Sequence, residues 1–402
     1  MRVAIIQDWL VEFGGAEKVL GELINLYPDA DLFALYDFVP KNKRGFLHNK
    51  NVKTSFLQKM PLAKKIYRSY LPLMPIAVEQ FDFSSYDLVI SSSSAVAKGI
   101  ITGPDQLHIS YVHSPIRYAW DMTHQYLEQT GHNKGLKGII TKMILHYIRM
   151  WDYRTGANPD LMIGNSNFIA RRIDKVYRRK AEVIYPPVDV DKFELKTEKD
   201  NFYMTASRLV PYKKIDLIVE AFAQMPDKKL VVIGDGPEYD KIKAKATPNI
   251  RLLGYQSDQS LKDYLGRAKA FVFAAEEDFG ILPLEAQACG TPVIAFGKGG
   301  ALETVKKDIT GIFFYAQTVP AIVEAVSNFE ITAAFDPYAI RAHAEQFSVA
   351  TFHRKISRTI EDEILKHPTL AQKYYQTIPK KVVERRRSIK LEWASPDIPV
   401  EI

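Results

Sequence analysis

Two parallel α/β domains, each built around a doubly wound sheet, are predicted from three features of the sequence. Apolar, strand-like runs alternate with helical patterns through both halves of the chain. These runs are continuously apolar, which is typical of parallel strands covered by helices on both faces. A segment rich in proline and charge, "YPPVDVDKFELKTEKDN" (185–201), separates the two series. With 402 residues, the chain is also too long for one ordinary core.

Ten runs are expected to form strands, five in each half. Helical stretches between them, such as "KIDLIVEAFAQM", predict right-handed crossover connections. The expected strands are Val3–Asp8, Tyr86–Ser92, Leu107–His113, Asp160–Ser166 and Ala181–Pro187, then Asn201–Arg208, Lys229–Gly236, Asn249–Tyr255, Ala268–Ala275 and Thr291–Phe296.

The segment after Phe347 predicts one further helix, "SVATFHRKISRTIEDEIL", followed by a tail with basic clusters and prolines that we expect to be peripheral or loosely ordered. The predicted division is a first domain over 1–190, a linker over 191–200, a second domain over 201–346, a helix over 347–366 and a basic tail over 367–402.

Composition excludes several classes of protein. The single cysteine, Cys289, argues against a disulfide framework and a cysteine-rich metal site, and it fits a reducing cytoplasm. The N-terminal apolar run is too short for a signal peptide, and no stretch reaches the length that crosses a bilayer. The net charge of +7 permits anionic partners such as nucleotide diphosphates, membrane surfaces or nucleic acid. Scattered basic residues without a nucleic-acid motif argue against nucleic acid.

Two stretches of the first half are basic and apolar together, at 59–78 and 134–154. In the second, apolar residues recur at helical spacing. We favour the interpretation that they pack on the sheet; the alternative is a face that meets anionic lipid head groups. These residues are Ile139, Ile140, Met143, Ile144, Tyr147 and Ile148.

Two carboxylates flank a predicted turn into a helix in "EEDFGILPLEAQACGTPVIAFGKGGALETV". Glu277 lies in the loop that follows a strand, and Glu285 is expected in the first turn of a helix that contains Pro283. No Ser, Thr, Asp or Asn immediately precedes this helix, so its first amides could bind an anion or a sugar hydroxyl. The alternative is that Asp278 or water caps them.

Basic and glycine-rich loops follow the first strand of each half. Arg208 and Lys213 surround a proline turn and suit a diphosphate, although alone they would be interpreted as solvated surface cations. Gly14–Gly15 would let a backbone approach a phosphate, although a lone pair of glycines usually marks a turn. Neither this pair nor "GDGPEY" has the glycine spacing of a dinucleotide fingerprint.

Together these loops resemble glycosyltransferase family 4, whose members have the GT-B fold. The resemblance is carried by "SRLVPYK", "EEDFGILPLE" and "ACGTPVIAFGKGGALETV". The first half is similar to the bacterial branch of WbaZ-like O-antigen mannosyltransferases in three stretches: "MPIAVEQFDFSSYDLVISSSSAVAKG", "YVHSPIRYAWD" and "WDYRTGANPDLMIGNS". The resemblance covers roughly residues 2–365. One departure is Lys214, where many members have glycine.

The resemblance implies two Rossmann-like domains facing across a cleft, acceptor domain first and nucleotide-sugar donor domain second, with a C-terminal return helix. It also implies roles for individual residues. Arg208 and Lys213 would neutralise the donor diphosphate, Glu285 would bind the ribose, and Glu277 would face the transferred sugar. His113 would touch the sugar or the reacting oxygen. The amides of Asp278, Phe279, Gly280 and Ile281 would line the sugar, Gly14 and Gly15 would close over the phosphates, and Arg117, Tyr118, Trp120 and Asp121 would lie toward the acceptor.

The implied reaction is a retaining transfer of a sugar to a lipid-linked glycan in bacterial surface polysaccharide synthesis, at the cytoplasmic face of the plasma membrane. Mannose from GDP-mannose is the donor expected from the resemblance. No carboxylate pair is evidently placed for double displacement, so a front-face transfer is favoured over Glu277 as a nucleophile. The alternatives are a UDP-sugar-dependent transferase, an epimerase or phosphorylase on a similar scaffold, and a non-catalytic membrane scaffold.

Two further groups of residues have simpler interpretations. Without the "HSP" context, His113 would be interpreted as a buried core histidine. The Asp-x-Asp pairs at 29–31 and 189–191 are interpreted as structural, and no required metal or cofactor is expected.

Overall fold

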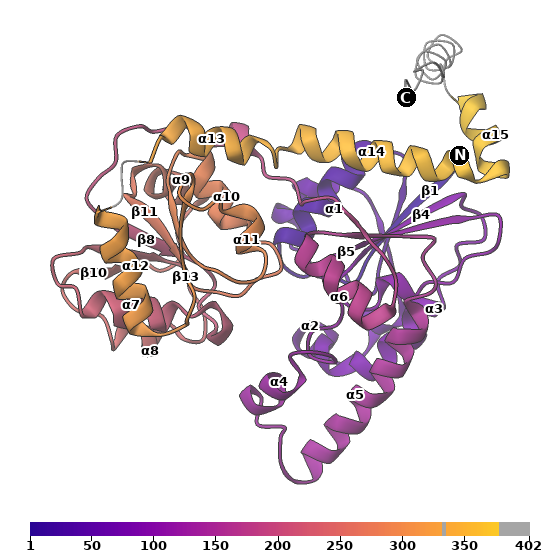
Figure 1. Ribbon diagram of the computed structural model, residues 1–402. Helices are drawn as coiled ribbons and strands as arrows, with labels where there is room; N and C mark the ends of the chain where they lie inside the picture. Colours follow the sequence, from indigo (N-terminus) through magenta and orange to yellow (C-terminus); the bar gives the residue numbers. More distant parts are fainter. Residues whose placement is uncertain (332–334, 378–402) are drawn as a thin grey trace, which may run out of the picture.

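The structure, a computed structural model, describes residues 1–331 and 335–377. It contains two fully parallel sheets. Sheet one has seven strands in the order β3-β2-β1-β4-β5-β6-β7, and sheet two has six in the order β10-β9-β8-β11-β12-β13 (Figure 1). The order reverses once in each sheet, between β1 and β4 and between β8 and β11, as in doubly wound folds. The predicted α/β architecture is confirmed.

The strands of both sheets are short and largely buried, with apolar side chains on both faces. In sheet one they are β1 (Val3–Gln7), β2 (Asp31–Ala34), β3 (Val52–Thr54), β4 (Leu88–Ser93), β5 (Leu107–Val112), β6 (Leu161–Gly164) and β7 (Glu182–Val183). In sheet two they are β8 (Tyr203–Ala206), β9 (Leu230–Ile233), β10 (Ile250–Leu252), β11 (Ala270–Phe273), β12 (Val293–Phe296) and β13 (Gly311–Phe314).

The helices connect these strands and cover the sheets. In the first domain they are α1 (Gly15–Leu26), α2 (Ala63–Ile66), α3 (Met74–Glu79), α4 (Thr123–Gln129), α5 (Gly135–Thr155) and α6 (Asn167–Tyr177). In the second they are α7 (Ile215–Ala223), α8 (Tyr239–Lys243), α9 (Asp258–Arg267), α10 (Ile281–Ala288), α11 (Ala301–Thr304), α12 (Val319–Ile331) and α13 (Pro337–Glu345).

The chain returns to the first domain through α14 (Val349–Lys366), which lies along that domain in Figure 1. Its apolar face, Phe352, Ile356, Ile360 and Ile364, is buried in the same core as Ile5 and Leu20. The tail expected from residue 367 begins instead with another helix, α15 (Pro368–Thr377), whose Leu370 is fully buried in that core. The remainder of the predicted basic tail, 378–402, lies outside the described residues.

Three strands have no counterpart in the sequence prediction: β2, β3 and β13. Each has only three or four residues, and β3 and β13 are sheet edges. Runs this short carry too little periodicity to be recognised, and their strand conformation depends on pairing with a neighbour.

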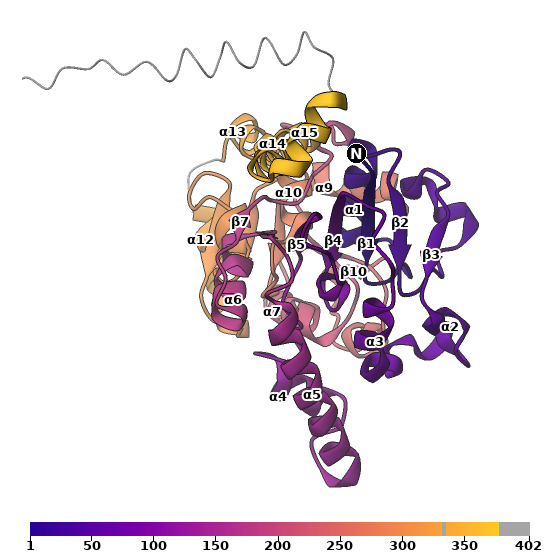
Figure 2. The ribbon, with the colours of Figure 1, turned by 90° about the vertical axis from the view of Figure 1, so that its right-hand side faces the viewer.

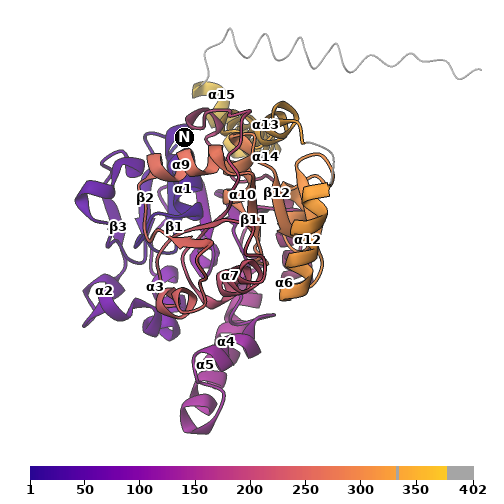
Figure 3. The ribbon, with the colours of Figure 1, turned by 90° about the vertical axis from the view of Figure 1, so that its left-hand side faces the viewer.

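The favoured interpretation of 134–154 is wrong for most of its apolar residues. Ile144 is partly buried and Ile148 is buried, but Ile139, Ile140, Met143 and Tyr147 are exposed. Figures 2 and 3 show the reason: α4 and α5 extend beyond the rest of the fold, so only one face and the base of α5 meet the domain. In the described part of the chain, no helix has the length and apolar character needed to cross a bilayer.

Candidate functional site

The predicted donor-binding residues lie in loops at the carboxyl ends of strands beside the reversal point of each sheet. Gly14 and Gly15 follow β1, Arg208 and Lys213 follow β8, and Glu277 follows β11. Ligands of open parallel sheets bind at these positions, because the loops on either side of the reversal leave a crevice. The loops after β1 and β8 meet directly, since Arg208 pairs with Glu12.

The N-terminus of α10 has no side-chain cap. The N-cap is Gly280, at φ +91°, a backbone conformation that favours glycine. Among the described residues, nothing accepts a hydrogen bond from the backbone amides of Asp278, Phe279, Gly280 or Ile281. Gly15 of the other domain lies directly opposite, since a Cβ atom there would be 3.1 Å from Ile281 Cδ1. The free amides and the positive end of α10 therefore face the Gly14–Gly15 turn.

Two glycines hold the Glu277 loop in place from behind. A Cβ on Gly299 would lie 2.5 Å from the Glu277 carbonyl oxygen, and one on Gly300 would lie 2.3 Å from Phe279 Cα. The Gly300 amide also donates a hydrogen bond to the Glu277 carbonyl at 2.8 Å. Side chains at these two positions would displace the loop that carries Glu277 and the free amides.

The predicted cations and carboxylates pair with one another in three contacts. Lys213 pairs with Glu277 inside the second domain, and both side chains are mostly buried. Arg208 Nη1 lies 3.0 Å from Glu12 Oε2 of the first domain, in an exposed pair. Lys18 Nζ lies 2.5 Å from Glu285 Oε1, also across the domain contact. Arg208, Lys213, Glu277 and Glu285 thus line one region between the domains.

Lys18 was not predicted, although a signal was present in "GGAEK", where a cation follows the glycine pair within one helical turn. Glu285 is the fifth residue of α10, just past the first turn in which we expected it, and its side chain is only 10% exposed. A buried carboxylate requires a partner, and Lys18 supplies it.

Arg117 was assigned to the acceptor and the backbone amide of Asp278 to the sugar. The side chains of these two residues contact each other. Arg117 pairs with Asp278, and Arg172 of α6 approaches the same carboxylate at 3.3 Å. Arg172 also pairs with Asp121 and donates to Ser114 Oγ at 2.7 Å. The side chain of Asp278 therefore does not cap α10. It connects the loop between β11 and α10 (274–280, the donor loop) to the predicted acceptor segment (117–121). Arg172 has no motif that would have identified it from sequence.

Tyr118 and Trp120 are partly buried against the first-domain core. Trp120 Nε1 donates a hydrogen bond to Asp152 at 2.6 Å, and Asp152 is fully buried against Lys98. The Tyr118 ring lies 5.5 Å from Tyr126 of α4. Of the four predicted acceptor residues, Asp121 is the exposed one. Lys98 and Asp152 were not predicted from sequence.

His113 is buried at the end of β5, with Nε2 2.8 Å from Ser92 Oγ. Burial lowers its pKa to about 4, so the ring is neutral near pH 7. A neutral imidazole can exchange a hydrogen bond with a hydroxyl but cannot neutralise a phosphate.

Two acidic residues beside the glycine turn are buried. Asp8, directly after β1, accepts backbone hydrogen bonds from Ser94 to Ala97 and so fixes the loop after β4. Glu17 Oε2 accepts from the Gly14 amide at 2.9 Å. Burial raises the pKa of the Glu17 carboxyl from 4.5 to about 7.

Glu17→Gln is expected to stabilise the protein at pH 8 and to have little effect below pH 4.5. Because the folded pKa exceeds the unfolded one, the stability linked to Glu17 is fully present below pH 4.5 and is lost as pH rises through 7, by about 3 kcal/mol at most. Glutamine keeps an acceptor for the Gly14 amide and cannot ionise. Melting temperatures of both proteins between pH 4.5 and 8.5 test this; parallel curves would contradict it.

A carboxylate of the second domain caps a helix of the first. Glu303 of α11 accepts hydrogen bonds from the Asn167 and Phe168 amides at 2.7 and 2.8 Å, at the positive end of α6. Tyr185, in the segment 185–201 that connects the domains (the connector), donates to the same carboxylate at 3.1 Å. This contact fixes how the domains meet beside the donor loop.

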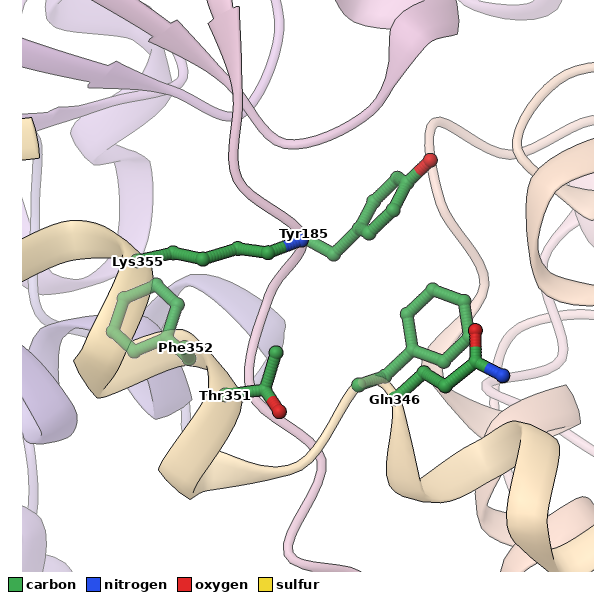
Figure 4. A pocket seen from close by; sticks show the side chains of 6 residues that line it. Tyr185, Gln346, Thr351, Phe352 and Lys355 are labelled. Carbon is green, nitrogen blue, oxygen red and sulfur yellow. The ribbon is translucent and has the colours of Figure 1, made fainter. Parts of the chain in front are cut away.

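The connector and the returning chain cross at an aromatic cluster. Tyr185 stacks on Phe279 at 5.5 Å and lies 5.1 Å from Phe347. Figure 4 shows Tyr185 on the connector, with Gln346 at the end of α13 and Lys355 of α14 on either side of the crossing. The donor loop therefore packs, through Phe279, directly on the two segments of the chain that cross between the domains.

Neither Asp-x-Asp pair is arranged as a metal site. Asp31 accepts from the Tyr86 hydroxyl at 2.5 Å, and Asp189 pairs with Lys192 at 2.6 Å. Over residues 1–331 and 335–377, no group of three or more His, Cys, Asp or Glu side chains could hold a metal ion.

Comparison with solved structures identifies the architecture. The crystal structure of Anabaena Alr3699/HepE in complex with UDP-glucose matches 90% of this chain and 100% of its own, with a TM-score of 0.66 at 19% identity. Sucrose-phosphate synthase from Thermosynechococcus elongatus matches 91% and 100%, with a TM-score of 0.66 at 16% identity. The fold is GT-B.

A family model matches the second domain of this GT-B chain. Residues 189–346 match the family described as "Glycosyl transferases group 1". The D-inositol 3-phosphate glycosyltransferase of Mycobacterium leprae is 28% identical over 220 residues, which are 47% of this chain and 51% of that protein. The GDP-mannose-dependent monoacylated α-(1-6)-phosphatidylinositol monomannoside mannosyltransferase of Corynebacterium glutamicum is 29% identical over 52% of this chain and 64% of its own. The matches thus span about half to two thirds of the length of these curated relatives.

Proposed function

We propose that this protein is a retaining glycosyltransferase that moves mannose from GDP-mannose to a lipid-linked glycan acceptor in bacterial surface polysaccharide synthesis. The observation that carries the proposal is the convergence of Lys213, Glu277 and Glu285 with the free amides at the start of α10, opposite Gly14–Gly15. The family matched by residues 189–346 supports the reaction type.

The charges of this region suit a nucleotide-sugar donor. Lys213 and Arg208 would share their charge between the carboxylates they contact and the donor diphosphate, which stabilises the departing nucleotide. Glu285 would accept hydrogen bonds from the ribose. The free amides of Asp278 to Ile281 would donate to the sugar hydroxyls, since they have no other acceptor in the described chain.

A front-face transfer fits the surroundings of Glu277. Its carboxylate pairs with Lys213, and such a partner disfavours attack on the anomeric carbon because it lowers the nucleophilicity of the oxygen. In the proposed reaction the acceptor oxygen forms a bond to the anomeric carbon as the bond to the diphosphate breaks, and the diphosphate oxygen takes the acceptor proton. His113, neutral and buried, would only orient a hydroxyl.

Mannose is supported by two relatives, and guanine by one of them. The Corynebacterium relative is a GDP-mannose-dependent enzyme, and another is the yeast α-1,3/1,6-mannosyltransferase ALG2, 28% identical over 38% of this chain. The O-antigen-type, WbaZ-like acceptor and a cytoplasmic site at the inner membrane follow from the resemblance of the first-domain motifs. The rival donor is a UDP sugar, because HepE, of the same fold, binds UDP-glucose.

A donor screen tests the proposal. GDP and GDP-mannose, at about 100 times their dissociation constants, are expected to raise the free energy of unfolding by about 2.7 kcal/mol, whereas UDP and UDP-glucose should not. Slow GDP release from GDP-mannose without acceptor, unchanged by EDTA, is the expected reaction. Stabilisation by UDP sugars alone would overturn the donor, and no response to any nucleotide sugar would overturn the function.

A further inference from the structure

The helix α5 of the first domain presents an exposed apolar stripe on a part of the molecule that extends beyond the rest of the fold (Figure 2). Its members are spaced alternately four and three residues apart, which keeps them on one face of a helix. The stripe consists of Leu136, Ile140, Met143, Tyr147 and Met150, exposed by 73, 49, 67, 39 and 55%, with Ile139 beside it at 57%. An exposed run of this length on a projecting element is typical of an interaction surface.

The charges around the stripe all have one sign. Lys134, Lys137 and Lys142 are exposed, and no Asp or Glu occurs from Lys134 to Trp151. In the described chain, the ion pairs of α5 are Asp152–Lys98 and Arg154–Glu79, both at its base.

A second element of the same kind lies at the same end of the first domain. In and beside α2, Leu62 and Ile66 are exposed by 65 and 41%, and Lys64, Lys65 and Arg68 accompany them. In Figures 1 and 2, α2 lies on the side of the domain from which α5 projects.

We propose that the α5 stripe docks on the surface of an anionic lipid bilayer, with its apolar side chains in the interface and its lysines against the head groups. Helices with an apolar face flanked by Lys and Arg bind such surfaces by burying apolar area and by electrostatic attraction. A second copy of this chain fits less well, because pairing two stripes would bring Lys137 and Lys142 toward the same charges of the partner.

The base of α5 connects this surface to the predicted acceptor segment. Asp152 holds Trp120, and Arg149 donates to the Ala119 carbonyl oxygen at 3.0 Å. Docking would therefore hold residues 117–121 close to the bilayer, where a lipid-linked acceptor resides. This last point rests on the proposed function, whereas docking itself does not.

Vesicle binding of the full chain, without sugar nucleotide, tests the inference. Wild type is expected to cosediment with vesicles of phosphatidylcholine and phosphatidylglycerol, weakly with phosphatidylcholine alone, and less as salt rises. Ile140→Asp/Met143→Asp should lower the affinity roughly tenfold or more. The matched control, Ile331→Asp/Tyr338→Asp, changes two similarly exposed apolar residues of the second domain and should bind as wild type does.

The remaining outcomes separate the alternatives. Lys137→Gln/Lys142→Gln should reduce both the preference for phosphatidylglycerol and the salt dependence. Equal vesicle binding by wild type and the α5 variant would overturn the inference, as would a wild-type dimer that ignores vesicles and that the variant converts to monomer. The α5 variant should keep the wild-type thermal response to GDP-mannose; if wild type binds vesicles but no nucleotide, the proposed function fails and docking stands.

Discussion

Lys213→Ala is expected to lower kcat/KM for sugar transfer by roughly 10³-fold, or about 4 kcal/mol of transition-state stabilisation. Lys213 lies at the end of the loop after β8 and contacts Glu277, so it can reach both the carboxylate and a diphosphate held at the start of α10. Negative charge grows on the leaving diphosphate as the bond to the sugar breaks, and the ammonium stabilises that charge. Steady-state kinetics with GDP-mannose and an acceptor lipid measure the effect.

The neighbouring lysine provides a matched control. Lys214 has φ +57°, a conformation that favours glycine, which explains why a related loop can carry glycine there. Lys214→Gly removes one charge without straining the backbone and should keep kcat/KM within a few-fold of wild type. An Lys213→Ala protein that folds, binds GDP and still transfers within tenfold of wild type would show that this side chain does not hold the diphosphate.

Lys98→Met is expected to destabilise the first domain by roughly 3–5 kcal/mol, which lowers its melting temperature by about 10 °C. Lys98 and Asp152 are 1% and 0% exposed, and the substitution leaves the buried carboxylate without its counter-charge. Trp120 and Tyr177 still donate to Asp152, at 2.6 and 3.0 Å, but neither carries charge. Thermal unfolding followed by circular dichroism measures the loss.

A double variant distinguishes the lost charge from lost packing. Lys98→Met/Asp152→Asn should recover more than half of the stability that Lys98→Met loses. The amide oxygen of the asparagine can still accept a hydrogen bond from Trp120, and no unpaired charge remains. The exposed pair of Lys180 with Asp174, in which the lysine side chain is 90% exposed, provides a control. Lys180→Met breaks this pair and should change the free energy of unfolding by less than about 1 kcal/mol. Equal losses from Lys98→Met and Lys180→Met would contradict a buried ion pair.

Local sequence patterns were sufficient to predict most of the strands and the fold class. The apolar parts of runs such as "KLVVIGDG" and "AKAFVFAA" are strands in the structure, because a buried parallel strand must be apolar on both faces. The edge strands β3 and β13 were not predicted, because three or four residues are too few to show a hydrophobic periodicity. The helix at 135–155 was recognised, but the environment of its apolar face was not. Helical spacing shows that a face is apolar and says nothing about what covers it.

For the candidate site, the chain order of strands already placed Arg208, Lys213 and Glu277 at one edge of a sheet, because the carboxyl ends of parallel strands meet there. Sequence patterns were therefore enough to predict the kind of fold and the loops that could carry chemistry. They did not predict which charges pair across the domains: Lys18 with Glu285, 267 residues apart, Arg172 with Asp278, and Glu303 with the start of α6. Such contacts depend on how two separately folded domains meet, and no local pattern of residues encodes that geometry.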